Sequence, residues 1–300
     1  MNLNFPRDLV PCKSDHNVYK YLVDEGQRRA GESSIAFVGI ARNVAHCIER
    51  NVRLCQSAAS LFKGHDIFIY ENDSDDGTQD ILPTLGINYK CDRREDKDYR
   101  DDLDTPVDPY HKKRSAIIAD LRNRYVEYLM GLPKFDYVAV IDWDLAGGFD
   151  IQGLFHSLAL LQIKSDAACM TSYGLLSNPA GTDPLEKCPR GEFIMYDSFA
   201  FRPLTLPGPI FITQCVMFNH QSFTLGAEPV EVCSNFGGMG LYRGEVFHRY
   251  KYQSKEWPNM PGCIDCDHVC LHRKLREDGY KIYLNPSMLT SYAKHRYIND

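Results

Sequence analysis

The sequence predicts an α/β fold, in which a mostly parallel central sheet is flanked by helices within a single domain. Short apolar runs rich in β-branched residues alternate along the chain with segments whose apolar residues recur at helical spacing. This alternation is typical of the right-handed crossovers that build a parallel sheet. Polar residues also gather directly after several of the apolar runs, as they do in open α/β sheets that bind ligands. A chain of 300 residues is long enough for one large domain with an ample core.

The expected elements follow in order along the chain. Strands are expected at 35–40, 66–70, 138–141 and 167–171. Helices are expected at 48–62, 79–85, 114–129, 154–161 and 269–276.

Two further segments stand out by their composition. The stretch 178–229 is rich in Pro, Gly and aromatic residues, which predicts an irregular recognition region. The stretch 92–104 is dense in charges of both signs and is interpreted as a solvated loop, with a lid over a charged ligand as the alternative.

Composition excludes some partners and compartments. The net charge of −6 argues against nucleic acid as the main partner, because phosphate contacts need a basic face. We see no transmembrane segment and no secretory signal in the sequence, which leaves peripheral association with a membrane open. The 11 cysteines are an odd number in a chain too large to need a disulfide framework, which predicts reduced thiols and a cytoplasmic location. A trimmed form of an anchored secretory-pathway enzyme would look the same.

The most informative stretch runs from Val138 to Asp144, where a buried strand ends in Asp142-Trp143-Asp144. Two carboxylates at this spacing would point to one side of a continuing strand. Carboxylate oxygens suit Mg²⁺ or Mn²⁺, which usually also contact substrate phosphates. The alternative is a solvated acidic turn, which is common after strands.

Three strand ends are expected to meet in one polar crevice, because a crossover sheet places them at one edge. They carry Arg42 and Asn43, the acidic cluster 71–76, and the pair Asp142 and Asp144. The chain has no G-x-G-x-x-G after the first strand and no P-loop, which argues against a Rossmann dinucleotide site and a P-loop NTPase. It also lacks the zincin, nucleophile-elbow and kinase signatures.

The order of these features resembles a nucleotide-sugar-dependent glycosyltransferase of the GT-A type, which has a Rossmann-like fold. More narrowly, the chain resembles the fungal capsule-associated α-mannosyltransferase family from about Phe37 to His295. The segments that carry the likeness, in addition to 71–78 and 142–144, are 119–124, 196–202, 230–239 and 265–271. The intact Asp142-Trp143-Asp144 departs from the less acidic version expected in the fungal family.

The resemblance implies roles for individual residues. It makes Asp142 and Asp144 ligands of the metal that contacts the donor diphosphate, with His295 completing that site. It divides the chain into an N-terminal extension (1–30), a nucleotide-sugar-binding half (31–145) and an acceptor-binding half (146–300). It implies that the nucleotide-sugar donor is bound by Ala41, Arg42, Asn43, Glu71, Asp73, Arg122, Asp142, Trp143 and Gly238.

Asp265 and Asp267 are the implied catalytic acids. In an inverting enzyme one would remove the acceptor hydroxyl proton, and in a retaining enzyme it would orient the sugar. The alternative for either acid is a cap on the helix at 269–276.

Other residues also have structural alternatives. Arg122 could form a surface ion pair, and the glycines around Gly238 could form a simple turn. The group Cys263, Cys266, His268, Cys270 and His272 has spacings that a structural zinc could use, with ordinary helix packing as the alternative.

The sequence therefore predicts a metal-dependent hexosyltransferase that uses Mn²⁺ or Mg²⁺ and acts on a saccharide hydroxyl in glycan synthesis. The resemblance favours GDP-mannose as the donor, with a UDP-hexose second. Two alternatives stay open: a metal-dependent phosphotransferase or nucleotidyltransferase that uses the same acidic pair, and a non-catalytic carbohydrate-binding relative of the fold.

Overall fold

The computed structural model describes residues 16–93, 112–177, 193–210, 212–257 and 260–292. Most of the charged stretch 92–104, the first part of the segment 178–229, and His295 lie outside the described residues. The helices that are described include none with the length and apolar character needed to cross a membrane.

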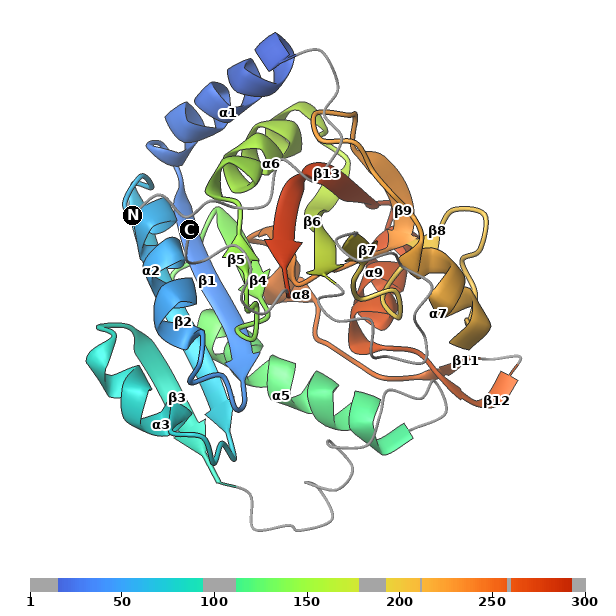
Figure 1. Ribbon diagram of the computed structural model, residues 1–300, viewed down its shortest axis with the longest axis horizontal. Helices are drawn as coiled ribbons and strands as arrows, with labels where there is room; N and C mark the ends of the chain where they lie inside the picture. The colour runs from blue at the N-terminus through green and yellow to red at the C-terminus, as the bar shows by residue number, and fades with distance from the viewer. Residues whose placement is uncertain (1–15, 94–111, 178–192, 211, 258–259, 293–300) are drawn as a thin grey trace.

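A single large sheet organises the described chain (Figure 1). Its main strand order is β3-β2-β1-β4-β10-β6-β13-β9-β8, while β5 pairs with β13 and β7 pairs with β6. A separate two-stranded sheet is formed by β11 and β12. The strands are β1 (Ser34–Ala41), β2 (Gly64–Asn72), β3 (Asn88–Asp92), β4 (Tyr137–Ile141), β5 (Gly148–Phe149), β6 (Ala167–Ser177), β7 (Phe193–Met195), β8 (Arg202–Pro203), β9 (Val230–Ser234), β10 (Met239–Arg243), β11 (Glu256–Trp257), β12 (Met260–Ile264) and β13 (Lys281–Ser291).

The sheet is mostly parallel, as the sequence predicts. Strands β3, β2, β1, β4, β6 and β13 all run in one direction. Strand β10 runs in the opposite direction between β4 and β6, and β9 runs in the opposite direction beside β13. The halves 31–145 and 146–300 thus contribute adjacent parts of one continuous sheet.

Helices cover both faces of this sheet, and in Figure 1 the sheet lies between α1 and α6 above and α5 below. Helices α1, α2 and α6 pack on one face, and α5, α7, α8 and α9 contribute to the core on the other. The helices are α1 (His16–Ala30), α2 (Ile48–Ala59), α3 (Thr78–Ile81), the 3₁₀ turn η2 (Leu82–Thr84), α5 (Lys112–Met130), α6 (Ile151–Ile163), α7 (Ile212–Asn219), α8 (Val246–Arg249) and α9 (Asp267–Glu277).

Strand β4 shows why the apolar run before Asp142 is buried along its whole length. Val138 and Val140 belong to the core shared with α5 and α9, whereas Tyr137, Ala139 and Ile141 belong to the core shared with α2 and α6. Successive side chains in a strand point to opposite faces, so a strand covered on both faces is apolar throughout. The strand ends at Ile141, and Asp142 therefore lies just beyond it.

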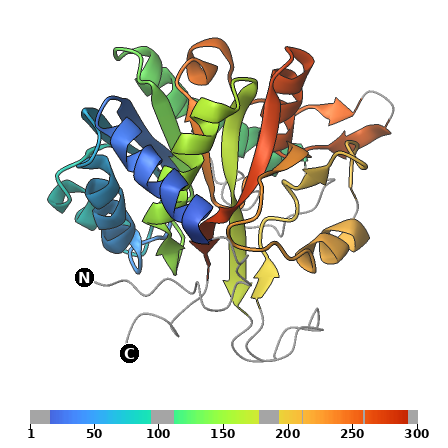
Figure 2. The same cartoon turned by 90° about the horizontal axis from the view of Figure 1, so that it is seen from above.

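The N-terminal helix α1 lies against α6 (Figure 2). The ring of Tyr19 stacks on His156 of α6 with a centroid separation of 5.1 Å. Gly26 lies so close to the α6 backbone that an added Cβ would lie 1.9 Å from the Phe155 carbonyl oxygen. The part of the predicted extension that is described is therefore packed on the main sheet domain.

The four predicted strands are confirmed as β1, β2, β4 and β6, and the predicted helices are confirmed as α2, α3 with η2, α5, α6 and α9. Strands β3, β9, β10 and β13 were not predicted from the sequence. The last of these contains Pro286 and bulges against β6 between Asn285 and Leu289, so its apolar pattern is broken.

Candidate functional site

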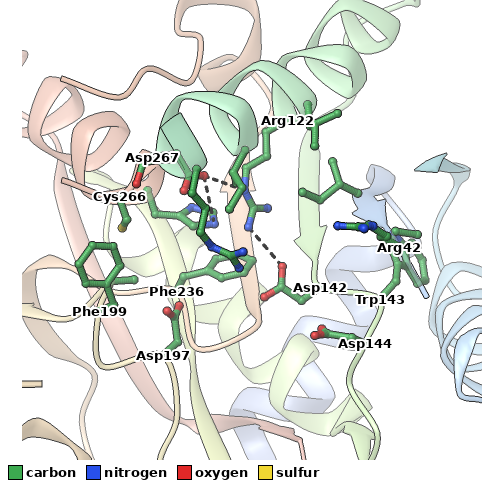
Figure 3. A pocket seen from close by; sticks show the side chains of 18 of the residues that line it. Arg42, Arg122, Asp142, Trp143, Asp144, Asp197, Phe199, Phe236, Cys266 and Asp267 are labelled. Carbon is green, nitrogen blue, oxygen red and sulfur yellow. Dashed lines mark hydrogen bonds and ion pairs between the residues drawn. The ribbon is translucent and has the colours of Figure 1, made fainter. Parts of the chain in front are cut away.

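A cavity of about 330 Å³ opens where β1, β2 and β4 end. One wall comes from these strand ends, with Ala41, Arg42 and Asn72 beside the Asp142–Asp144 loop. The opposite wall comes from α5, from Phe236, and from the beginning of α9 (Figure 3). Ligands of open α/β sheets bind at the carboxyl ends of the strands, and this cavity has that position.

Asp142 is held by three contacts. One carboxylate oxygen lies 3.3 Å from Nη2 of Arg122, and the other accepts a 2.8 Å hydrogen bond from the hydroxyl of Tyr292. Its backbone N–H donates to the Gly238 carbonyl at 2.9 Å. These contacts fix the carboxylate on the cavity wall.

Trp143 anchors the loop between the two acids. Its side chain is buried, and its carbonyl accepts hydrogen bonds from Nδ2 of Asn51 at 2.9 Å and from Sγ of Cys47 at 3.3 Å. Gly39 of β1 makes room for the indole, since a Cβ there would lie 2.7 Å from Trp143 Nε1. Trp143 lines the cavity, and its buried ring fixes the turn in place.

Asp144 lines the cavity and forms no ion pair with the described residues, and Figure 3 shows it beside Asp142. Desolvation within the cavity, followed by the like charge of Asp142, raises the pKa of Asp144 to about 7. Asp197 lines the same cavity, where burial and then the Asp142 carboxylate raise its pKa to about 8. Desolvation, reinforced by the charge of Asp142, therefore favours the protonated form of both carboxyl groups in the unliganded protein.

Arg122 connects the two walls. Its Nε lies 2.7 Å from the Asp267 carboxylate, and its guanidinium lies over the rings of Phe236 and Tyr252, at 5.2 and 5.7 Å from their centroids. The side chain is buried, so the alternative of a surface ion pair is wrong.

Asp265 and Asp267 occupy different surroundings. Asp267 opens α9 and lines the cavity beside Arg122. Asp265 is buried in an ion pair with Arg202 and is not among the cavity-lining residues. The residue at the cap position of α9 is Cys266, so neither acid is the capping residue.

Some of the residues predicted to bind the nucleotide line the cavity, and others do not. Ala41 and Arg42 line the cavity, whereas Asn43, Glu71 and Asp73 are not among its lining residues. Those three belong to a network that joins the loops after β1 and β2. In it the Asn43 N–H donates to Ser74 Oγ at 3.0 Å, and the Asn43 side-chain oxygen accepts from Asp75 N at 2.9 Å. The Glu71 carboxylate accepts from Ser74 N at 2.8 Å. Asp73 N donates to the carbonyl of Asp92 in β3 at 3.3 Å.

Gly238 likewise lies behind the acidic loop and is not among the lining residues. Its φ is +94°, and an added Cβ would lie 2.6 Å from the Tyr292 hydroxyl. A glycine is needed here because the backbone passes close to Tyr292 while its carbonyl accepts from Asp142.

No three acidic, His or Cys side chains within the described residues gather where they could hold a metal, so the zinc alternative gains no support. His272 is instead hydrogen-bonded to Ser234 Oγ at 2.9 Å and to the Tyr242 hydroxyl at 2.8 Å.

Sequence reasoning assigned no role in the site to Asp197 or Tyr292, and it considered His268 only as a possible zinc ligand. Asp197 adopts a left-handed conformation with φ of +61°, which a sequence does not reveal in a non-glycine residue. Tyr292 follows β13 and reaches Asp142 from a distant part of the chain. The segments 196–202 and 265–271, which carry the family resemblance, contain Asp197 and His268 but do not reveal these contacts.

No protein-family model and no curated protein matches this chain. Solved structures give weak likenesses. One is the mannosyltransferase PcManGT from Pyrobaculum calidifontis in complex with GDP-Man and Mn²⁺, with a TM-score of 0.44 and 10% identity over 91% of this chain and 65% of that one. Another is S. aureus TarS in complex with UDP-GlcNAc, with a TM-score of 0.43 and 9% identity over 88% of this chain and 59% of that one.

A third is the M. tuberculosis glucosyl-3-phosphoglycerate synthase, with a TM-score of 0.44 and 12% identity over 93% of this chain and 77% of that one. This chain spans less than two thirds of the length of the first two proteins. Likenesses of this strength carry nothing about the activity of this chain, and the narrower resemblance to the fungal family stays a prediction.

Proposed function

We propose that this chain is a metal-dependent glycosyltransferase of the GT-A type, which transfers a hexose from a nucleotide-diphosphate sugar to a saccharide hydroxyl. The observation that carries the proposal is the cavity at the strand ends, where Asp142 and Asp144 share one wall and Arg122 and Asp267 lie on the other. The sequence resemblance supports the same class. It favours GDP-mannose as the donor, with a UDP-hexose second.

The acidic pair fits Mn²⁺ or Mg²⁺. Both cations prefer oxygen ligands, and Asp142 and Asp144 present carboxylate oxygens to one cavity. A divalent cation there would also offset the desolvation and the like charge of Asp142 that raise the pKa of Asp144. When bound, the metal supplies positive charge against the negative charge that develops on the departing diphosphate.

The protein's own side chains position the reactants in this proposal. Arg42 lines the same wall as the acids and would bind the donor through its guanidinium. Arg122 holds Asp142 and Asp267 in a fixed relation.

Asp267 is the acid we carry forward as catalytic. It would accept the acceptor hydroxyl proton in an inverting reaction, or orient the hexose in a retaining one. Asp265 would support it by fixing the segment before α9 through its ion pair with Arg202.

The phosphotransferase alternative would need a third carboxylate in the metal shell. Asp197 and Asp267 line the cavity, but within the described part of the chain no group of three such side chains is placed to hold a metal. Asp267 is also occupied by Arg122 at 2.7 Å. Nothing in the described site favours this alternative over sugar transfer.

The experiment that tests the proposal compares the wild-type protein with Asp144→Ala. We expect release of GDP from GDP-mannose, or of UDP from a UDP-hexose, to need Mn²⁺ or Mg²⁺ and to fall at least about a hundredfold in the variant. The unliganded melting temperature should not fall, because the Asp144 side chain forms no ion pair with the described residues and lies next to a like charge. Turnover near the wild-type rate in Asp144→Ala would refute the metal assignment.

A further inference from the structure

His268 lies in the first turn of α9 and lines the cavity, and only 3% of the residue is exposed. Neither of its ring nitrogens has a hydrogen-bond partner among the described residues. The nearest carboxylate oxygen, on Asp267, is 4.0 Å from Nε2, which is beyond hydrogen-bond length. Buried polar groups are normally paired, so an unpaired imidazole on a cavity wall indicates a ligand.

The ring is held in place by aromatic neighbours. It stacks on Phe236 with a centroid separation of 3.8 Å and an interplanar angle of 17°, and it meets Tyr252 edge to face at 5.4 Å. Such a ring is preorganised, since its orientation does not depend on the missing hydrogen bonds.

His272, one turn further along α9, provides the contrast. It is equally buried, yet both of its ring nitrogens are hydrogen-bonded within the protein, to Ser234 and Tyr242. The two nitrogens of His268 are thus left unpaired at the cavity, while the neighbouring histidine on the same helix is fully paired.

The charge state of His268 narrows the chemical class of the ligand group that could pair with its ring. Burial, the Arg122 guanidinium and His272 hold the pKa of His268 well below its ordinary value, so the ring is neutral near pH 7. A neutral imidazole has one donor and one acceptor nitrogen. A hydroxyl group can pair with either nitrogen, whereas a phosphate oxygen only accepts and an ammonium only donates.

We propose that His268 binds a hydroxyl of the transferred hexose and thereby contributes to the choice of donor sugar. The inference rests on the proposed function. The hexose is favoured over the acceptor because His268 stacks on Phe236, and Arg122, which pairs with Asp142 on the proposed diphosphate side, lies over the same ring. His268 therefore lies next to Arg122 and Asp267, which connect the cavity wall that carries Asp142 to the opposite wall.

The test compares the wild-type protein with His268→Phe, which keeps a flat ring against Phe236 but removes both nitrogens. Dissociation constants are measured by calorimetry with Mn²⁺ for GDP and GDP-mannose, and for UDP and UDP-glucose. We expect His268→Phe to leave binding of the diphosphate alone within about twofold and to weaken the nucleotide sugar about tenfold. His268→Gln, which keeps a donor and an acceptor, should recover part of the loss.

The matched control is His248→Phe, the same replacement on the exposed side of α8. It should leave both dissociation constants unchanged. A second series uses wild-type protein and donors that lack one sugar hydroxyl each. The wild-type protein should bind one of these donors about tenfold more weakly than the parent donor. The His268→Phe variant should bind that donor and the parent donor with equal dissociation constants.

The outcomes separate the two proposals. If the wild-type protein binds the nucleotide sugar and His268→Phe binds it equally well, the role of His268 is wrong while the proposed function stands. If the wild-type protein binds neither diphosphate nor nucleotide sugar, both are wrong. Should His268→Phe not fold, the deoxy-sugar series on the wild-type protein decides, and equal affinity for all its members would overturn the inference.

Discussion

Asp142 is the residue on which the contacts of the candidate site converge. Arg122 and Tyr292 each hold one of its carboxylate oxygens, and Gly238 holds its backbone N–H. The sequence identifies Asp142 because a buried strand ends there, which is a local pattern. It does not identify Tyr292, because that contact joins segments far apart in the chain and depends on where β13 lies in the sheet.

The variant Arg42→Ala tests the proposed donor-binding wall at the scale of one residue. We expect Arg42→Ala to raise the dissociation constant for the nucleotide sugar about tenfold or more, with a smaller effect on the rate of turnover at saturation, because the guanidinium lines the cavity and would bind donor phosphate or nucleotide. The control is Arg53→Ala on the exposed side of α2, where Arg53 pairs with Glu49. An unchanged donor dissociation constant in Arg42→Ala would refute its role.

At the scale of elements, the strand ends are joined by their loops before any ligand binds. The N–H groups of Asn43, Val44 and Ala45 after β1 donate to Ser74, Thr78 and Asp76 after β2. Part of the acidic cluster 71–76 therefore has a structural role.

Sequence reasoning placed this cluster correctly at the sheet edge. It could not separate the ligand-facing residues from those that join the loops, since both kinds are short polar residues after a strand.

Gly238→Ala tests how closely the loop before β10 packs against the site. We expect a loss of about 2–4 kcal/mol in the free energy of unfolding, because φ is +94° and the new Cβ would lie 2.6 Å from the Tyr292 hydroxyl and 2.9 Å from Leu145 Cδ2. Chemical denaturation measures this loss in the free energy of unfolding.

Gly77→Ala is the matched control, since its φ is +90° but nothing lies within 4 Å of the added Cβ. It should lose only about 1 kcal/mol, the cost of the backbone conformation alone. Equal losses in the two variants would contradict the close packing around Gly238.

At the scale of the whole molecule, the alternation of strands and helices predicted β1, β2 and β4 in the first half of the sheet but not the edge strand β3. The later half was harder to predict, because β10 inserts antiparallel between β4 and β6 and β13 contains a bulge. Neither feature has a local periodicity of its own. Long-range pairing therefore decided the part of the fold that brings Phe236 and His268 to the cavity and Tyr292 to Asp142.

The crowding of carboxylates predicts how the stability of the unliganded protein depends on pH. Asp144 and Asp197 have folded-state pKa values of about 7 and about 8, above their ordinary value of 3.8. Groups with raised pKa values bind protons more tightly in the folded protein, so their stabilising contribution falls from about pH 3.8 upward and is lost once the pH has risen through 7 to 8. His268 and His272, whose pKa values are lowered, act in the opposite direction but only below about pH 6.5.

We therefore expect the free energy of unfolding to fall between pH 6.5 and 8.5, measured in a chelator by chemical denaturation. The double variant Asp144→Asn with Asp197→Asn should show a flatter profile over the same range, and Asp75→Asn on the exposed loop should match the wild-type protein. A wild-type stability that rises with pH across this interval would be inconsistent with the crowded carboxylates.

The measurement that tests the central claim most directly is thermal stability in the presence of GDP, UDP, CMP or ADP, each with and without Mn²⁺. A ligand that binds only the folded protein raises its melting temperature. At about 100 times the dissociation constant, we predict a rise of about 5 °C with one nucleoside diphosphate, only when Mn²⁺ is present and only in the wild-type protein. A rise that persists in Asp144→Ala, or no rise with any nucleotide, would contradict a metal-dependent nucleotide-sugar site at Asp142 and Asp144.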